Sequence, residues 1–274
     1  MNHVTLNNIY LSNLQRKSTK IALELNDNSK QQSLSFSGLI SASNVKNFII
    51  SYLTIQNSNI FSLIEIFNVQ NFEIRDLQII NCQQAMNNMN TYVLSIIGVA
   101  SQTLSNIFIT QNSNLQFIYA TNKFRQNGTS YFLETDNFYI NNLNISQNLQ
   151  YLSNSSQVSV ESSFCSFNNI TYQNNQGNFF IILSQSLLIQ NSLFQHNTGL
   201  NGGALALSQY SNLILIKNTT FQFNQAFASG GAIYLENVGA QIQMDNFVKI
   251  NQNQDLIAQF LIIMLNSLEI SNQA

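Results

Sequence analysis

Apolar and polar residues alternate along short segments of this chain. Three of these segments align letter by letter as Asn-Phe-x-Ile, at residues 47–50, 71–74 and 137–140. Each is followed by a second apolar pair: Leu53/Ile55, Leu77/Ile79 and Leu143/Ile145. Such alternation is typical of a strand with one buried face. Because the alternation shifts by one residue between the halves, we expect a bend that returns the second half to the same core.

The segments belong to a repeat that runs along most of the chain. Each repeat ends with an apolar or aromatic anchor, namely Ile55, Ile79, Ile109, Ile145, Tyr172, Phe194, Phe221 and Val248. An Asn follows two or three residues later, at Asn57, Asn81, Asn112, Asn148, Asn175, Asn197, Asn224 and Asn251. The anchors lie about 22 to about 36 residues apart, which is within the range of solenoid repeats. We therefore expect short strands that pair in parallel, coil on coil.

The repeated Asn has two possible physical roles. Asn tolerates a left-handed backbone at tight turns, and its amide can bond to the same residue one coil above and below. The alternative, that Asn falls there by chance because it is abundant, stays open. Since crossovers between parallel strands are right-handed, the pattern predicts an all-β fold, a right-handed parallel β-helix (solenoid) of roughly 8–10 coils.

The repeat also predicts the domain organisation. We expect one β-helix segment over residues 1–274, with irregular first coils in 1–44 and the clearest repeats in 190–236. Two coils are longer, and residues 83–90 and 121–128 should leave them as loops. The chain shows neither a polar cap nor a signal sequence, so we expect it to be a piece of a longer protein.

Composition narrows the classes of function. Charged residues make up 8% of the chain and the net charge is −2. Without a basic stripe to neutralise phosphates, nucleic acid is excluded as a partner. The chain contains no proline, which suits a backbone held mostly in strand ladders.

One motif occurs twice, as Phe-x-x-Asn followed by Gly-Gly-Ala. The first copy contains Phe194, Asn197, Gly202 and Gly203, and the second contains Phe221, Asn224, Gly230 and Gly231. Paired glycines permit positive φ and close backbone approach. The motif resembles the repeat of the polymorphic outer-membrane proteins, adhesins with a parallel β-helix of pectin-lyase-like fold, and is similar to repeats of large protist surface proteins. This resemblance covers residues 190–236 and implies an architectural motif without a catalytic residue.

Candidate catalytic groups are sparse. Cleavage of polysaccharides on such a scaffold needs clustered carboxylates or calcium. The aspartates stand alone in their coils, at Asp27, Asp76, Asp136, Asp245 and Asp255. Glu73, Arg75 and Asp76 form the densest group, in which Glu73 and Arg75 share an outward face and are interpreted as a surface pair. We expect no catalytic residue, no cofactor and no metal.

The histidines and cysteines also lack the spacing of metal ligands or of disulfide partners. His196 has no neighbouring ligand and is interpreted as a surface residue. Cys82 and Cys165 lie about three coils apart, or about 14 Å, whereas a disulfide needs Cα atoms within about 7 Å. We therefore predict two unpaired thiols. Five sequons, at Asn127, Asn144, Asn154, Asn169 and Asn218, would accept glycans in a secretory pathway.

Two functions remain. The first is a non-catalytic β-helix scaffold or adhesion segment of a larger cell-surface or membrane-anchored protein. It would lie on the extracellular face, bind a glycan or a surface protein, and reach the membrane only through parts of the parent chain outside this sequence. The alternative is a carbohydrate-active enzyme or carbohydrate-binding module of pectin-lyase-like fold, which would need two outward carboxylates within about 6 Å on adjacent coils.

Overall fold

The computed structural model describes most of the chain. The described residues are 3–12, 23–26, 40–60, 63–84, 93–112, 118–121, 123–126, 129–132, 137–148, 158–160, 162–177, 179–182, 186–208, 212–238, 240–245, 249–251, 254–255 and 263–265. They form strands and turns, which makes the fold all-β. The described part of the chain contains no helix of the length and apolarity that a membrane crossing requires.

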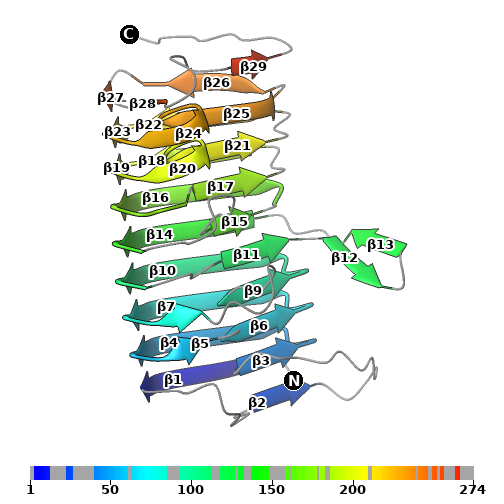
Figure 1. Ribbon diagram of the computed structural model, residues 1–274. Coiled ribbons are helices and arrows are strands. Elements are labelled where there is room, and N and C mark those ends of the chain that lie inside the picture. Colours follow the sequence, from blue (N-terminus) through cyan, green and yellow to red (C-terminus); the bar gives the residue numbers. More distant parts are fainter. Residues whose placement is uncertain are drawn as a thin grey trace.

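Two large parallel sheets dominate the fold (Figure 1). Sheet A consists of β1 (His3–Ser12), β4 (Asn47–Gln56), β7 (Asn71–Ile80), β10 (Ser101–Thr110), β14 (Asn137–Ser146), β16 (Phe164–Gln173), β18 (Ser186–Gln190), β19 (Leu193–Gln195), β22 (Leu213–Lys217), β23 (Thr220–Gln222), β26 (Gln241–Met244) and β27 (Lys249–Asn251). Sheet B consists of β2 (Leu23–Asn26), β3 (Ile40–Ser43), β6 (Ile64–Phe67), β9 (Leu94–Ile97), β11 (Ile118–Thr121), β15 (Val158–Val160), β17 (Phe179–Ile182), β21 (Leu205–Ser208), β25 (Ile233–Val238) and β29 (Ile263–Leu265).

Smaller sheets complete the described part of the chain. β5 (Asn59–Ile60) pairs with β8 (Gln83–Gln84). Sheet E contains β20 (Thr198–Asn201), β24 (Gln225–Ser229) and β28 (Gln254–Asp255). β12 (Lys123–Gln126) and β13 (Thr129–Phe132) form an antiparallel pair.

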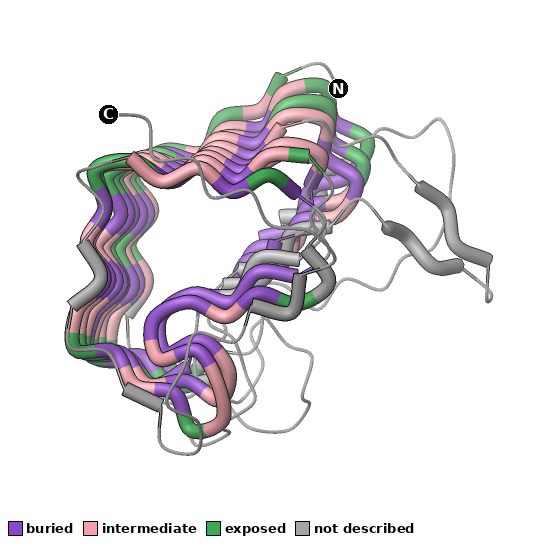
Figure 2. The backbone as a smooth tube through the Cα atoms, turned by 90° about the horizontal axis from the view of Figure 1, so that it is seen from above, coloured by how far each residue is buried: buried purple, intermediate pink, exposed green. Residues whose placement is uncertain are grey.

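The chain returns to the same sheets again and again. From β3 onward a strand of sheet B is followed by a strand of sheet A, and we call each such pair a layer. Every pairing within the two large sheets is parallel, for example β4 with β7 and β10 with β14. Viewed from above, the strands of successive layers lie over one another (Figure 2). The expected parallel pairing of one repeat on the next is confirmed.

The ten-residue strands of sheet A bend in the middle. In β4 the buried residues alternate up to Ile50, and the alternation resumes one residue out of phase at Leu53. Between them, Tyr52 has φ 56°. The equivalent residue of β7, Asp76, has φ 59°. A single left-handed residue therefore turns both halves of each strand toward one core, as the phase shift predicted.

The aligned segments of the sequence are in register in space. Asn47 pairs with Asn71, and the two anchors Ile55 and Ile79 face each other one layer apart. The anchor column continues through Ile109, Ile145, Tyr172, Phe194 and Phe221. In the last layer, however, Phe221 pairs with Ile250. The predicted anchor Val248, which lies outside the described residues, was therefore wrong by two positions. Its predicted amide, Asn251, is in register with Gln222 and belongs to neither Asn column.

The core is a single cluster of apolar side chains from both sheets. Aromatic residues fill the layers around the repeated motif, where Phe194 and Phe221 stack with ring centroids 4.9 Å apart. Phe179 contacts Tyr172 and Phe194 edge to face. Parallel stacking of identical positions places like side chains on top of one another, so the core repeats with the period of the sequence.

The glycine pairs form turns, as their positions in the motif predicted. Gly202 and Gly230 have φ 73° and 72°. A Cβ atom on Gly203 would lie 2.1 Å from the carbonyl oxygen of Gly231 in the next layer. The Gly203 N–H donates to the Gly230 carbonyl at 3.0 Å. Glycine is therefore required here by backbone conformation at two positions and by contact between layers at a third.

Both long repeats differ from the predicted loops, because each segment contains a strand. Residues 83–84 form β8, and the rest of the predicted 83–90 loop lies outside the described residues. In the 121–128 segment, by contrast, Thr121 ends β11 and residues 123–126 form β12 of an antiparallel hairpin that stands apart from the large sheets (Figure 1). The segment leaves the large sheets, as predicted, but it forms a hairpin rather than a loop. Asn127-Gly128, a dipeptide that favours two-residue hairpin turns, was the signal in the sequence.

Candidate functional site

Among the residues that the structure describes, the ionisable side chains form a pair rather than a larger cluster. Glu73 and Arg75 form a two-point ion pair on the outer face of β7, with Nε–Oε1 at 2.6 Å and Nη2–Oε2 at 2.7 Å. The hydrogen bond and the charge of Glu73 raise the pKa of Arg75. The interpretation of these two residues as a surface pair is confirmed.

The described carboxylates have uncharged neighbours in the adjacent layers. Glu73 lies in register between Ile49 and Thr103. Asp76 accepts a hydrogen bond from Asn106 at 2.9 Å, and Asp245 accepts the Asn218 N–H at 3.0 Å. Asp27 and Asp136 lie outside the described residues, as does the side chain of Asp255. Within the described ranges, no group of three His, Cys, Asp or Glu side chains could hold a metal.

His196 and the two cysteines have structural surroundings. The exposed imidazole of His196 stacks on Phe223, with ring centroids 4.7 Å apart and planes 4° from parallel, a contact that the sequence did not reveal. Cys82 and Cys165 are buried and form no disulfide, as predicted. Burial raises the pKa of Cys82 and so disfavours its reactive thiolate form.

The most regular polar feature is a column that we call the buried amide ladder: Asn112, Asn148, Asn175, Asn197 and Asn224. Each residue stands three positions after its anchor and is almost fully buried. The Asn175 Nδ2 donates to Asn197 Oδ1 at 3.2 Å and to the Ile145 carbonyl at 2.9 Å. The Asn175 N–H also donates to Asn197 Oδ1, at 3.1 Å. Every bond from one ladder amide to another runs toward the next layer, while the same Nδ2 also donates to the anchor carbonyl of the preceding layer. The predicted stacking of these amides is confirmed.

The ladder changes chemistry at its beginning. Cys82 occupies the position below Asn112, and its N–H donates to Asn112 Oδ1 at 2.7 Å. The Cys82 thiol lies 3.8 Å from the Ile55 carbonyl, which corresponds to the carbonyl that the Asn amides reach in later layers. Ser58 occupies the position one layer below, where its hydroxyl donates to the Gln56 carbonyl. A thiol and a hydroxyl thus replace the amide in these layers.

Asn57 and Asn81, which the repeat grouped with this ladder, belong to a different column. Both are exposed, both have positive φ (50° and 51°), and the Asn81 Nδ2 donates to Asn57 Oδ1 at 2.7 Å. This column lies two positions after the anchor and includes Gln111, Gln147, Asn174, His196 and Phe223, all with positive φ. The exposed position therefore combines the left-handed turn with amide stacking, as at Asn57 and Asn81, whereas the buried position beside it stacks amides without positive φ.

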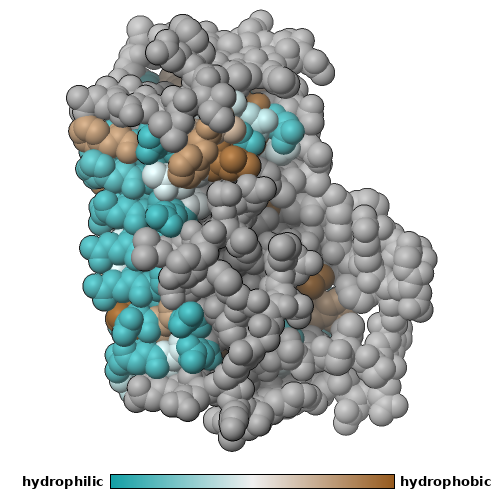
Figure 3. Space-filling view, in the orientation of Figure 1, coloured by the Kyte–Doolittle hydropathy of each residue, from teal (hydrophilic) through white to brown (hydrophobic). Residues whose placement is uncertain are grey.

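A second exposed column follows the bend of sheet A. The amides of Asn106, Asn142 and Asn169 each donate to the preceding member of the column at 2.8 to 2.9 Å, beginning at Asp76. In Figure 3, the described residues at the left edge of the molecule are mostly hydrophilic, with hydrophobic residues near the upper end. Neutral amides, rather than charges, are therefore the groups that this part of the molecule presents to a partner.

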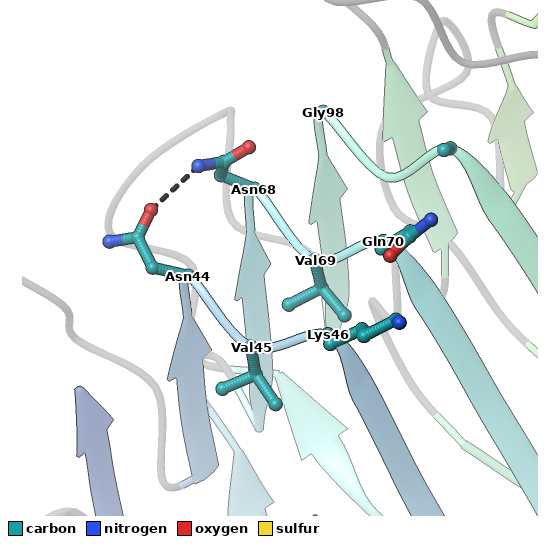
Figure 4. A pocket seen from close by; sticks show the side chains of 8 residues that line it. Asn44, Val45, Lys46, Asn68, Val69, Gln70 and Gly98 are labelled. Carbon is teal, nitrogen blue, oxygen red and sulfur yellow. Dashed lines mark hydrogen bonds between the residues drawn. The ribbon is translucent and has the colours of Figure 1, made fainter. Parts of the chain in front are cut away.

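A groove lies at the corner where sheet B passes into sheet A. It has a volume of about 420 Å³ and is lined by Asn44, Lys46, Asn68, Gln70, Gly98 and Ala100. Two valines, Val45 and Val69, separate the amides of Asn44 and Asn68 from the side chains of Lys46 and Gln70 (Figure 4). The volume is within the range of small-molecule sites.

The groove was not predicted from the sequence. Its signal is a break in a column: Asn44 and Asn68 follow β3 and β6 with φ 53° and 50°, whereas Gly98 follows β9 with φ 64°. The Asn68 Nδ2 donates to Asn44 Oδ1 at 2.6 Å. With Gly98 in the third layer, the column of side chains stops and the groove opens.

Comparison with known proteins gives no name to this site. No protein-family model, no curated protein and no solved structure matches the chain.

Proposed function

We propose that the chain is a right-handed parallel β-helix. In support, strands of sheets A and B alternate along the chain, all their pairings are parallel, and equivalent positions stay in register from layer to layer. Crossovers between parallel strands are right-handed in nearly all proteins. The Phe-x-x-Asn and Gly-Gly-Ala resemblance to polymorphic outer-membrane protein repeats is consistent with this architecture.

On this scaffold we propose a non-catalytic adhesion segment of a larger cell-surface or membrane-anchored protein, with a glycan or a surface protein as its partner. The observation that carries the proposal is the ordered array of exposed amides. Asn106, Asn142 and Asn169 repeat at the spacing of the layers. Amides present both a donor and an acceptor, and repeated hydroxyl-rich ligands such as glycans offer the complementary groups.

The alternative is a carbohydrate-active enzyme or binding module of pectin-lyase-like fold. The groove at Asn68 and Lys46 is the observation that favours it, because its volume suits a sugar. Catalysis would need two carboxylates that influence one another. Glu73, Asp76 and Asp245 each have a neutral partner or neighbour in the adjacent layer. Serine residues are likewise the neighbours of three other described acids, Glu24, Glu65 and Glu236.

Incubation of the purified chain with immobilised polysaccharides and with extracellular surface proteins separates the two functions. The adhesion proposal predicts saturable retention on at least one of these surfaces, with no sugar released into solution. Sugar release that rises with time and with chain concentration would establish the enzyme instead. Failure to bind any glycan or surface protein would contradict adhesion.

A further inference from the structure

The groove beside Gly98 is formed by the loss of side chains in two neighbouring columns. The first column is Asn44, Asn68 and Gly98, and the second is Lys46, Gln70 and Ala100. Both contain polar side chains in the first two layers, whereas the third layer contributes only the methyl group of Ala100. The wall behind them is closed, because Val45, Val69 and Val99 are buried in the core. The hollow therefore has polar groups at its sides and backbone at its upper end.

The groove offers three polar groups of different kinds. Asn68 uses its Nδ2 to bond Asn44, which leaves Oδ1 as an acceptor facing the layer of Gly98. Gln70 contributes a carboxamide with donors and an acceptor. Lys46 contributes an ammonium group, and no carboxylate of the described residues forms an ion pair with it. Together they present an acceptor, an amide and one positive charge.

We propose that this groove binds a short acidic saccharide, with its anionic group at Lys46 and Gln70 and a hydroxyl donating to Asn68 Oδ1. The proposal rests on the proposed adhesive function and names the class of glycan. A hydroxyl satisfies the free carbonyl of Asn68, and an anion satisfies the ammonium of Lys46. A carboxylate and a sulfate share this chemistry, and both are included in the test.

Substitution of Gly98 by Asn is the most specific test of the groove. Asn occupies the equivalent turn positions 44 and 68 at nearly the same φ, so the backbone at Gly98 also accepts Asn. The Gly98→Asn amide would reach Asn68 Oδ1 and continue the column, as Asn81 does with Asn57. This substitution should fill the groove and keep or raise the melting temperature.

The experiment titrates the isotopically labelled full chain by NMR with three matched sugars: cellobiouronic acid, a sulfated cellobiose and neutral cellobiose. We expect saturable shifts at Lys46, Gln70 and Gly98 with at least one acidic sugar, and binding of cellobiose weaker by about tenfold or more. Lys46→Gln should weaken the acidic sugar about tenfold, which corresponds to one charge-assisted hydrogen bond. Gly98→Asn should abolish binding without lowering the melting temperature.

Different results overturn the two proposals. Equal affinity for acidic and neutral sugars, unchanged binding by Lys46→Gln, or full binding by a folded Gly98→Asn chain would reject the acidic-saccharide site. If the Gly98→Asn chain is still retained on the surfaces that hold the wild type, the adhesion proposal survives the loss of the groove. Absence of retention on every surface would reject adhesion itself, whatever the NMR titration shows.

Discussion

Asparagine occupies two opposite environments at adjacent positions of the repeat. Asn174 is exposed and has φ 54°, whereas Asn175 is 1% exposed and bonds both neighbouring layers. The first position needs a residue that tolerates left-handed backbone. The second needs a short side chain with both a donor and an acceptor, because the layers above and below offer one of each. Asn meets both demands, for different reasons.

Asn175→Asp tests the buried position. The carboxylate keeps the shape of the amide but loses both N–H donors to Ile145 and Asn197 and places a charge in the core. We expect the free energy of unfolding to fall by about 3 kcal/mol or more, measured by chemical denaturation. Gln173→Glu is the matched control at the end of β16, two residues before Asn175, where the side chain is only half-buried. It should change stability by about 0.5 kcal/mol or less. Equal stability of the two variants would disprove the role of the ladder.

Tyr52→Asn tests the left-handed positions. Tyr52 is 59% exposed and has φ 56°. This left-handed conformation costs Tyr about 1 kcal/mol more than it costs Asn. We expect the variant to gain about 1 kcal/mol in thermal unfolding. Tyr10→Asn is the control for exposure, because Tyr10 is equally exposed and lacks positive φ. It also loses the hydrogen bond that the Tyr10 hydroxyl accepts from Gln56, so it should gain no stability. A loss of stability in Tyr52→Asn would mean that the ring makes a contact worth more than the strain.

At the scale of elements, the turns decide how closely layers approach. The backbone at Gly203 lies against Gly231 and Gln225 of the next layer. Neighbouring strands of a sheet are about 4.8 Å apart, and a turn that bulged outward would interrupt the ladder. The glycine pair keeps this corner flat enough for β21 and β25 to pair in register.

Gly203→Ala should therefore be strongly destabilising. The added Cβ would lie 2.1 Å from the Gly231 oxygen and 2.6 Å from the Gln225 nitrogen, both backbone atoms that cannot rotate away. We expect a loss of about 2 kcal/mol or more, seen as a lower melting temperature. Ser229→Ala, in the adjacent β24, should stay near the wild type. A Gly203→Ala chain with the wild-type melting temperature would show that the layers can separate at no cost.

The sequence patterns predicted the strands better than the turns that connect them. The alternation in residues 47–56 predicted the strand, its bend and its buried face, because burial alone selects those residues. The sequence pattern grouped Asn57 with Asn112, because the residue type alone does not show whether an Asn is required by a turn or by a buried hydrogen bond. The groove at Gly98 depends on which residue lies one layer below, and that becomes known only with the register.

At the scale of the whole molecule, one core joins the two large sheets. Tyr172 is buried within it, and its hydroxyl donates to the Gly177 carbonyl at 2.5 Å. Burial raises the pKa of Tyr172 well above its ordinary value. The folded chain therefore keeps this proton at pH values where the unfolded chain has already lost it.

Stability should fall in alkali for this reason. Below about pH 10, the ordinary pKa of Tyr, the folded and the unfolded chain both hold the Tyr172 proton. The contribution of buried Tyr172 to folding stability is then fully present. It is lost as the pH rises toward the folded-state value, because the unfolded state ionises first. Melting temperatures from pH 7 to 11 should decline more steeply for the wild type than for Tyr172→Phe, which should itself be about 1 kcal/mol less stable at neutral pH. Parallel curves would contradict this role, since Tyr234 and the other tyrosines are common to both chains.

The one-directional amide ladder has a mechanical consequence. Backbone hydrogen bonds between strands and amide bonds between Asn residues both run along the stacking direction, so a force applied along that direction loads them together. From Asn112 to Asn224 each junction carries the extra inner bonds. Between Ser58 and Cys82 a hydroxyl and a thiol stand in their place. A molecule stretched along its stack should therefore yield first at this end, and hold longest where the asparagines are continuous.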